Sequence, residues 1–299
     1  MSRESPPTRR VTALLDAVVR RPTHDYSLAE LAKDTGISKA TALGILNELA
    51  GTGWLARDPA RKTYGPGATM LAAGAAARAG HASVERARPH LVSLSRAHAA
   101  TCTASAVVDG QVTVLARTDP ADSAPTAAFR VGQRYPFAPP SGVMFVAWDD
   151  DAVVEEWFAS EPLAPLRTEP DQLRGVVAAC RAHGYLVVGL GEQDPGLQAL
   201  LARLGDDELS ARLGDLLRAA VPGDVQPYLT GDISPAKRYD VSLVCAPTFD
   251  ADARSDLLLA VLVMQTEMPG RSITRVAADV RKAAAAVTVE VGGRDPWVA

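Results

Sequence analysis

The sequence contains few cysteines and no long apolar segment. Its three cysteines, Cys102, Cys180 and Cys245, stand far apart, without the paired spacing of a disulfide framework or a zinc ribbon. No apolar run approaches the roughly 18 residues of a membrane span. The polar N-terminus lacks the apolar region of a signal peptide. We therefore expect a cytoplasmic protein that has no membrane partner.

The sequence also lacks the motifs of common enzyme classes. It contains no Gly-x-Ser-x-Gly, no Gly-x-x-x-x-Gly-Lys phosphate loop and no His-Glu-x-x-His. His90 and His98 stand eight positions apart with no third metal ligand in sight. Cys245 lies in an apolar segment, where a cysteine is more often core than nucleophile. We predict no catalytic residue, no metal site and no cofactor, and an enzyme on a sensor-like fold is the weakest alternative.

Length and charge indicate two domains of different character. The chain has 299 residues, of which 47% are hydrophobic and 22% charged, enough for sizeable cores. Residues 1–66 carry ten Lys and Arg against seven Asp and Glu, whereas the remainder carries 21 against 28. A mildly basic N-terminal part on an acidic body is typical of a protein that touches DNA at one end. Chance asymmetry would give the same balance.

The stretch 27–66 has the pattern of two helices followed by a hairpin. Ser27 and Glu30 have the spacing of a capping box at the start of a helix. Gly36 permits a sharp turn, and Ser38 is a good N-cap for the second helix. The apolar residues of that second helix recur at i, i+3, i+4 and i+7 and are predicted to point inward. They are Ala42, Ile45, Leu46 and Leu49.

Two further elements complete this N-terminal part. Residues 8–20 have an apolar stripe formed by Val11, Leu14, Leu15 and Val18, which predicts a helix that precedes the other two. Residues 54–57 and 62–64 flank a basic turn and are predicted to be the two strands of a wing. Trp54 and Tyr64 are expected to form the core of that wing.

The outward face of the second helix is mostly polar, as in helices that enter a DNA major groove. Basic residues at the start of the first helix and at the tip of the wing are predicted phosphate contacts. A solvated basic end and a soluble hairpin tip are the alternatives. The predicted DNA-binding residues are Arg9, Arg10, Ser38, Lys39, Thr41, Leu43, Asn47, Arg57, Arg61 and Lys62.

The rest of the chain mixes strands and helices. Residues 67–88 form an Ala-rich linking helix, a candidate dimer contact, and 84–98 form another helix. A hairpin turns across Asp109-Gly110. Further strands are expected at 129–135, 185–190, 242–249 and 257–266, and helices at 141–148, 152–158, 171–183 and 273–290. This mixture favours an α+β sensor domain. Residues 193–237 interrupt it with two amphipathic helices, interpreted as a lid, an oligomer contact or a surface elaboration.

Nearly the full chain resembles the IclR family of transcriptional regulators. The motifs in the N-terminal part are Leu-Ala-Glu-Leu-Ala, Thr-Gly-Ile-Ser-Lys-Ala-Thr-Ala-Leu, Gly-Trp-Leu-Ala-Arg-Asp and Tyr-Gly-Pro-Gly. The segments 132–136, 180–185 and 246–250 of the body are also similar to the family. The resemblance implies a winged helix-turn-helix (1–66), a linker helix (67–88) and a GAF-like α/β effector-binding domain (89–299). It also implies a homodimer or a dimer of dimers on a palindromic double-stranded DNA operator.

The resemblance further implies a pocket for a small-molecule effector. Several matching positions are apolar, so we expect a larger, partly apolar ligand whose anionic group is met by Arg130. Core packing is the alternative for each residue. The predicted effector-binding residues are Arg130, Tyr135, Phe137, Ser141, Gly142, Met144, Phe145, Leu243, Cys245, Leu262 and Met264.

Two departures from the family pattern limit this analogy. Gly44 occupies a position where the family usually has an arginine, so that a known operator sequence does not transfer. Either a close approach of the backbone to DNA or a neighbouring helix would explain the glycine. Val143 occupies the position after Ser141-Gly142 where the family often has a lysine, so a structural contact that depends on that lysine does not transfer either. Gly44 together with the acidic body leaves room for a winged-helix protein-interaction module that does not bind DNA specifically, which would lack the steep salt dependence of a DNA reader.

Overall fold

The structure is a computed structural model that describes residues 5–121, 129–139, 142–160, 170–189 and 228–297. The chain forms two compact units, residues 1–81 and residues 82–299, which we call the head and the body. Each unit is described by itself.

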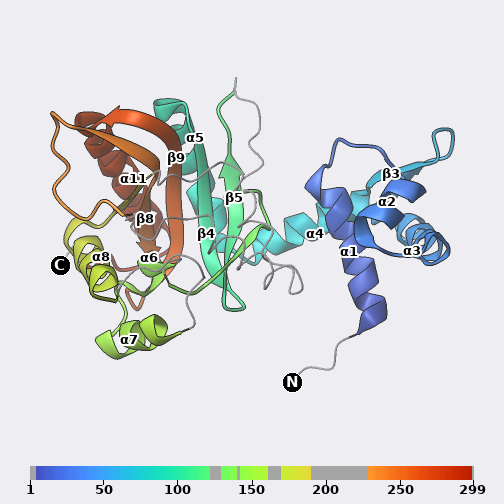
Figure 1. Cartoon of the computed structure of the whole chain (residues 1–299), viewed down its shortest axis with the longest axis horizontal. Helices are drawn as coiled ribbons and strands as arrows, with labels where there is room; N and C mark the ends of the chain where they lie inside the picture. The colour runs from blue at the N-terminus through green and yellow to red at the C-terminus, as the bar shows by residue number, and fades with distance from the viewer. Residues whose placement is uncertain (1–4, 122–128, 140–141, 161–169, 190–227, 298–299) are drawn as a thin grey trace, which may run out of the picture. The chain divides into compact units, whose positions relative to one another are not determined.

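The head is a helical domain with a small antiparallel sheet (Figure 1). The sheet has the strand order β1-β3-β2, so the predicted wing gains a third, two-residue strand. The buried core includes Leu14, Leu31, Leu46, Leu55 and Tyr64, which confirms the predicted inward faces of the helices. The elements are α1 (Pro6–Arg20), β1 (Tyr26–Ser27), α2 (Leu28–Thr35), α3 (Lys39–Gly51), β2 (Leu55–Asp58), β3 (Thr63–Pro66) and α4 (Ala68–Ala79).

Local signals fix where α2 and α3 begin. The backbone N–H of Ser27 donates to Glu30 Oε2 at 2.7 Å, and the N–H of Glu30 donates to Ser27 Oγ at 3.2 Å, which confirms the capping box. Gly36 ends α2 with φ 67°, a left-handed conformation that glycine adopts without steric cost. Ser38 Oγ accepts from the N–H of Thr41 at 3.2 Å and caps α3. The turn between the two helices is therefore defined at both ends.

The substitution Ser27→Ala is expected to destabilise the head by about 1 kcal/mol, because it removes an N-cap acceptor. The backbone N–H and the hydroxyl of Ser27 lower the pKa of Glu30. Since that pKa is lowered on folding, this stabilisation is present at neutral pH and is lost as the pH falls through the folded value. Urea unfolding at pH 7 and pH 4 measures both effects, with Ser27→Thr as the control that keeps a cap. An unchanged midpoint in the alanine variant would contradict the assignment.

The body contains a six-stranded sheet in the order β6-β5-β4-β9-β8-β7, in which every neighbouring pair is antiparallel. Its strands are β4 (Thr101–Val108), β5 (Gln111–Thr118), β6 (Arg134–Pro136), β7 (Leu186–Gly189), β8 (Arg238–Phe249) and β9 (Ser255–Pro269). Its helices are α5 (Ala82–His98), α6 (Val143–Val146), α7 (Asp151–Ala159), α8 (Pro170–His183) and α11 (Gly270–Glu290). The fold is α+β, as predicted.

Helices cover both faces of this sheet (Figure 1). The long helices α5 and α11 pack with Leu257, Leu259 and Val261 of β9 in one buried cluster. The shorter helices α6, α7 and α8 pack with Ala260 of β9 and with neighbouring strands in a second cluster. Strand β9 is therefore covered on both faces from Leu257 to Leu262, where only Leu258 is less than fully buried, as its apolar run predicts.

Several predicted boundaries differ from the structure. The hairpin turn is as expected, since Asp109 and Gly110 have φ 50° and 70°. The expected strand 129–135 is reduced to β6, and Phe129 before it has φ 57°, which is incompatible with an extended strand. The predicted helix 141–148 shortens to the four residues of α6.

The two overlapping helices predicted between residues 67 and 98 are separate in the structure, since α4 ends at Ala79 and α5 begins at Ala82. The predicted insertion lies outside the described residues as far as residue 227. Its last part begins with Tyr228, which pairs with Val188 in an isolated antiparallel bridge.

Candidate DNA-binding and effector-binding sites

Helix α3 is held by its apolar face and presents the opposite face outward. Ala42, Leu46 and Leu49 are buried in the head, whereas Leu43 and Asn47 are exposed. Of the ten predicted DNA-binding residues, nine are exposed and only Thr41 is half-buried. The Thr41 hydroxyl lies 2.9 Å from Ser38 Oγ, so both hydroxyls take part in the helix cap. Lys39 lies between them as the first residue of the helix.

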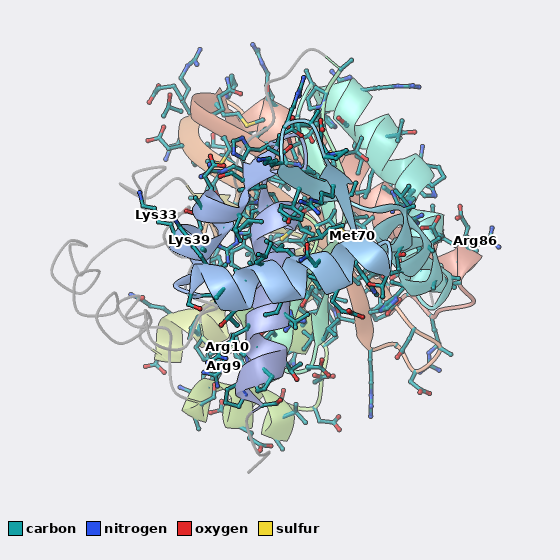
Figure 2. All side chains as sticks on the ribbon, turned by 90° about the vertical axis from the view of Figure 1, so that its right-hand side faces the viewer. Arg9, Arg10, Lys33, Lys39, Met70 and Arg86 are labelled. Atoms are coloured by element: carbon teal, nitrogen blue, oxygen red, sulfur yellow. The ribbon has the colours of Figure 1, made fainter. Side chains whose placement is uncertain are left out.

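The cationic residues predicted to contact DNA lie at three places on the head. Figure 2 shows Lys33 and Lys39 on either side of the turn between α2 and α3, and Arg9 and Arg10 near the start of α1. The third place is the wing.

The wing arginines make contacts inside the head. Arg61 Nη1 lies 3.0 Å from Asp25 Oδ2, and Arg61 Nε lies 3.9 Å from Asp58 Oδ2. The guanidinium of Arg57 lies over the ring of Tyr64, 5.9 Å from its centre. A phosphate contact by Arg61 therefore competes with an existing ion pair, which sequence spacing alone did not reveal. Lys62, with φ 56°, sits in the exposed turn between the strands.

In the body, most of the predicted effector-binding residues lie in packed structure. Met144 and Cys245 belong to the buried cluster beneath α6 and α8, and burial raises the pKa of the Cys245 thiol. The thiol therefore stays protonated at neutral pH and is a poor nucleophile. Leu262 is buried, Leu243 and Tyr135 are partly buried, and Met264 is 46% exposed. Ser141 lies outside the described residues.

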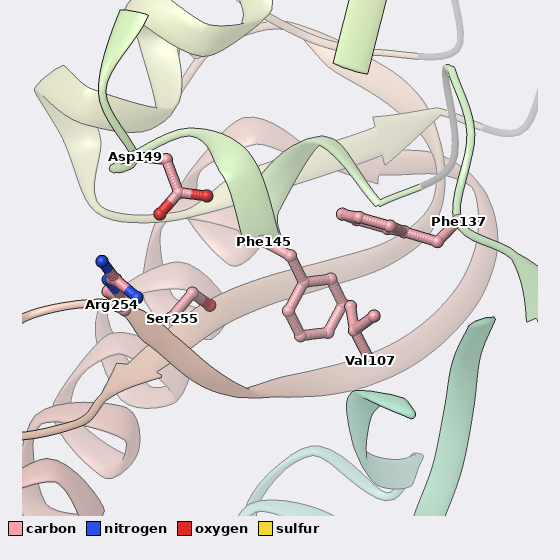
Figure 3. Close-up of a pocket in the computed structure, with 6 residues that line it drawn as sticks. All are labelled: Val107, Phe137, Phe145, Asp149, Arg254 and Ser255. Carbon is pink, nitrogen blue, oxygen red and sulfur yellow. The ribbon is translucent and has the colours of Figure 1, made fainter. Parts of the chain in front are cut away.

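A cavity of about 240 Å³ lies beside α6, near the turn that joins β8 to β9. Figure 3 shows Asp149, Arg254 and Ser255 on one side of it, and the aromatic and apolar side chains on the other. Phe137 and Phe145 belong to the predicted set, and Gly142 lies against the ring of Phe137. Sequence analysis missed the other four lining residues. The six are Val107, Phe137, Phe145, Asp149, Arg254 and Ser255.

The polar side of the cavity has a carboxyl group, a guanidinium cation and a hydroxyl. Burial raises the pKa of Asp149, as do the charges of Asp150 and Asp250, while Arg254 opposes them. Ser255 Oγ is buried and has no hydrogen-bond partner among the described residues. Arg130, the predicted partner of an anionic ligand, is exposed and does not line this cavity. The cavity therefore pairs an aromatic wall with the cation of Arg254.

The described part of the chain shows no cluster of three His, Cys, Asp or Glu that would hold a metal ion. The two histidines of α5 each face a single carboxylate: His90 Nε2 lies 3.0 Å from Glu290, and His98 Nε2 lies 3.0 Å from Asp279. Among the described helices, none is both long and apolar enough to span a membrane.

Comparison with known proteins gives matches of two kinds. Residues 8–59 match the model of the IclR helix-turn-helix domain, and residues 78–208 match the model of the bacterial transcriptional regulator IclR C-terminal domain. Together the two models cover more than half of the chain. Comparison with curated proteins gives no match.

Three solved structures illustrate the similarity of fold. An IclR transcriptional regulator from Alicyclobacillus acidocaldarius is 21% identical over 97% of this chain and 100% of its own, with a TM-score of 0.64. The IclR of Thermotoga maritima is 17% identical over 95% and 98%, with a TM-score of 0.65. An IclR homolog from Microbacterium hydrocarbonoxydans, complexed with 4-hydroxybenzoate, is 16% identical over 95% and 98%, with a TM-score of 0.61.

Proposed function

The chain belongs to the IclR family of bacterial transcriptional regulators, and we propose that it regulates transcription by binding a palindromic operator as a dimer or a dimer of dimers. In this arrangement the head binds DNA and the body binds an effector. The observation that carries the DNA-binding part is the outward face of α3, which is exposed while its opposite face is fixed in the core of the head. A dimer would place two such helices about one DNA turn apart, roughly 34 Å.

Helix α4 supports the proposal of a dimer. None of its twelve residues is fully buried, and Leu71 is 77% exposed. Its sequence is rich in alanine, and small side chains allow two helices to approach closely. An exposed apolar helix of this kind gains stability when a second copy covers it.

The cavity in the body supports the proposal of an effector that carries one ring and one anionic group. Phe137 and Phe145 provide an aromatic wall, and Arg254 provides a cation at the other side. The volume of about 240 Å³ is small among ligand sites, which favours a single-ring compound over the larger ligand expected from the sequence. The 4-hydroxybenzoate bound by the Microbacterium homolog belongs to this chemical class. Binding would favour one of two arrangements of the protein and so change its affinity for DNA.

Lys39→Ala is expected to weaken binding to the operator and to reduce its log–log salt slope by about 0.9 per protomer, since one phosphate contact is lost. Mobility-shift titrations of genomic fragments between 50 and 200 mM salt, roughly the range over which such contacts are lost, measure both quantities. Lys237→Ala removes an exposed lysine of the body and is the matched control. Equal affinity and equal salt slope for the two variants would count against α3 as the groove-binding element.

A further inference from the structure

The centre of the exposed face of α3 has three apolar residues and one amide, although the sequence predicts a mostly polar outward face. Ala40, Leu43, Gly44 and Asn47 are all exposed and recur at i, i+3, i+4 and i+7, which places them in one stripe opposite the buried residues. Leu43 is 39% exposed, one of the few large apolar side chains of the head that reach solvent to that extent. The stripe contains no arginine, the side chain that most often binds guanine.

No contact within the head explains why residue 44 is a glycine. A Cβ atom built at this position would meet no other atom within 4 Å, so no neighbouring helix needs the space. The backbone there is ordinary α-helix, which any residue adopts. A glycine in a helix interior is less favourable than alanine, so the head carries a less stable helix without any gain in its own packing. The explanation that fits is a partner that approaches the backbone at this point.

On the basis of the proposed function, we propose that Gly44 lets α3 sit deep in the major groove and that this face reads A·T base pairs. Asn47 lies one turn beyond Gly44 and is the one side chain of the stripe that both donates and accepts, the pattern that binds the N6 and N7 atoms of adenine. Leu43, beside Gly44, offers the apolar surface that contacts the C5-methyl group of thymine. Close approach brings both of these short side chains within reach of the base edges.

The charges around the stripe support DNA as the partner. Lys39 stands at the N-terminal end of α3, the end that contacts base edges in helix-turn-helix proteins. Lys33, Arg57 and Lys62 are exposed on neighbouring elements of the head. A largely apolar stripe with a cation at the N-terminal end of its helix, on a head that exposes further cations, matches a groove whose floor carries thymine methyl groups and whose edges are phosphates. An acidic protein surface would match the cations but would leave Leu43 against polar groups.

The test is selection of binding sites by the full-length protein from a random duplex pool, followed by mobility-shift titration. We expect half-sites with an adenine at one fixed position and thymine beside it. Asn47→Ala is expected to lose the preference for adenine at that position, with a fall of about 10-fold in affinity for the selected site. Gly44→Ala is expected to weaken binding by about 10-fold although the helix becomes more stable. Gly51→Ala makes the same change at the C-terminal end of α3, where Cβ also meets nothing, and is expected to bind as well as wild type.

The outcomes distinguish a failure of the proposed A·T preference from a failure of the proposed regulatory function. Enrichment of G·C pairs at the positions affected by Asn47→Ala, or equal DNA affinity of Gly44→Ala and Gly51→Ala, overturns the reading of A·T pairs and leaves the regulatory function intact. Failure of the wild-type protein to enrich any sequence, with and without benzoate as the trial effector, overturns the proposed function together with this inference.

Discussion

Arg254→Ala is expected to reduce the affinity of the protein for an aromatic carboxylate such as benzoate or 4-hydroxybenzoate by about 10-fold. A hydrogen bond to a charged group contributes roughly 1.5–3 kcal/mol when it is well shielded from water. Arg254 is exposed, so we expect the lower end of that range. The aromatic wall of Phe137 and Phe145 is unchanged in this variant, so residual binding should remain.

Asp149→Asn should have the opposite effect, because the native carboxylate faces the same cavity and repels an anionic ligand. Its pKa is raised in the folded protein, first by burial. The ionised form therefore opposes folding, so the protein gains stability as the pH falls and loses it as the pH rises through the raised pKa. The folding stability of the asparagine variant should lack this part of the pH dependence.

Calorimetric titration of the wild type, Arg254→Ala and Arg130→Ala distinguishes the two candidate cations. Sequence analysis favoured Arg130, whereas the cavity is lined by Arg254. If Arg130→Ala loses affinity and Arg254→Ala does not, the ligand lies elsewhere in the body. Tight binding of small keto acids alone, with no binding of aromatic carboxylates, would show that the aromatic wall does not recognise the effector.

The parts of the fold that the sequence predicts well are those fixed by local interactions. The capping box of Ser27 and Glu30, the left-handed turn at Gly36 and the Asp109-Gly110 hairpin each depend on residues within four positions of one another. The apolar spacing of α1 and α3 predicts their buried faces for the same reason. Such signals are visible in sequence because the partners are neighbours in the chain.

The cavity could not be predicted in this way, because its residues come from distant segments. Val107 is the last residue but one of β4, Asp149 follows α6, and Arg254 precedes β9, so only the tertiary packing brings them together. The strand β1 could not be predicted from local sequence either, because its two residues pair with Thr63 and Tyr64, far along the chain. Resemblance to a family pointed to α6 and to the middle of β8 and β9. Phe145 of α6 does line the cavity, whereas Met144 and Cys245 fill the space between the helices and the sheet.

Gly293 closes the junction between the C-terminal end of α11 and the end of β8, and Gly293→Ala is expected to destabilise the body by about 3 kcal/mol. A Cβ atom at this position would overlap the carbonyl oxygen of Phe249 and would lie 3.0 Å from the carbonyl oxygen of Thr288. Both are backbone atoms and cannot move aside as a flexible side chain would. Phe249 is itself fixed, because its N–H donates to the buried Thr288 Oγ1 at 3.0 Å.

The change should reach the proposed effector cavity, because Phe249 pairs with Ser255 at the start of β9. Unfolding of the full chain by urea, together with titration of benzoate, measures both consequences. Gly175→Ala is the matched control, since it lies within α8, where Cβ meets no atom, and should stabilise the body by up to about 1 kcal/mol. If the two alanine variants unfold at the same urea concentration, the contact at Phe249 does not constrain the body. A Gly293→Ala protein that is less stable but binds benzoate normally would instead place the ligand away from the β8–β9 turn.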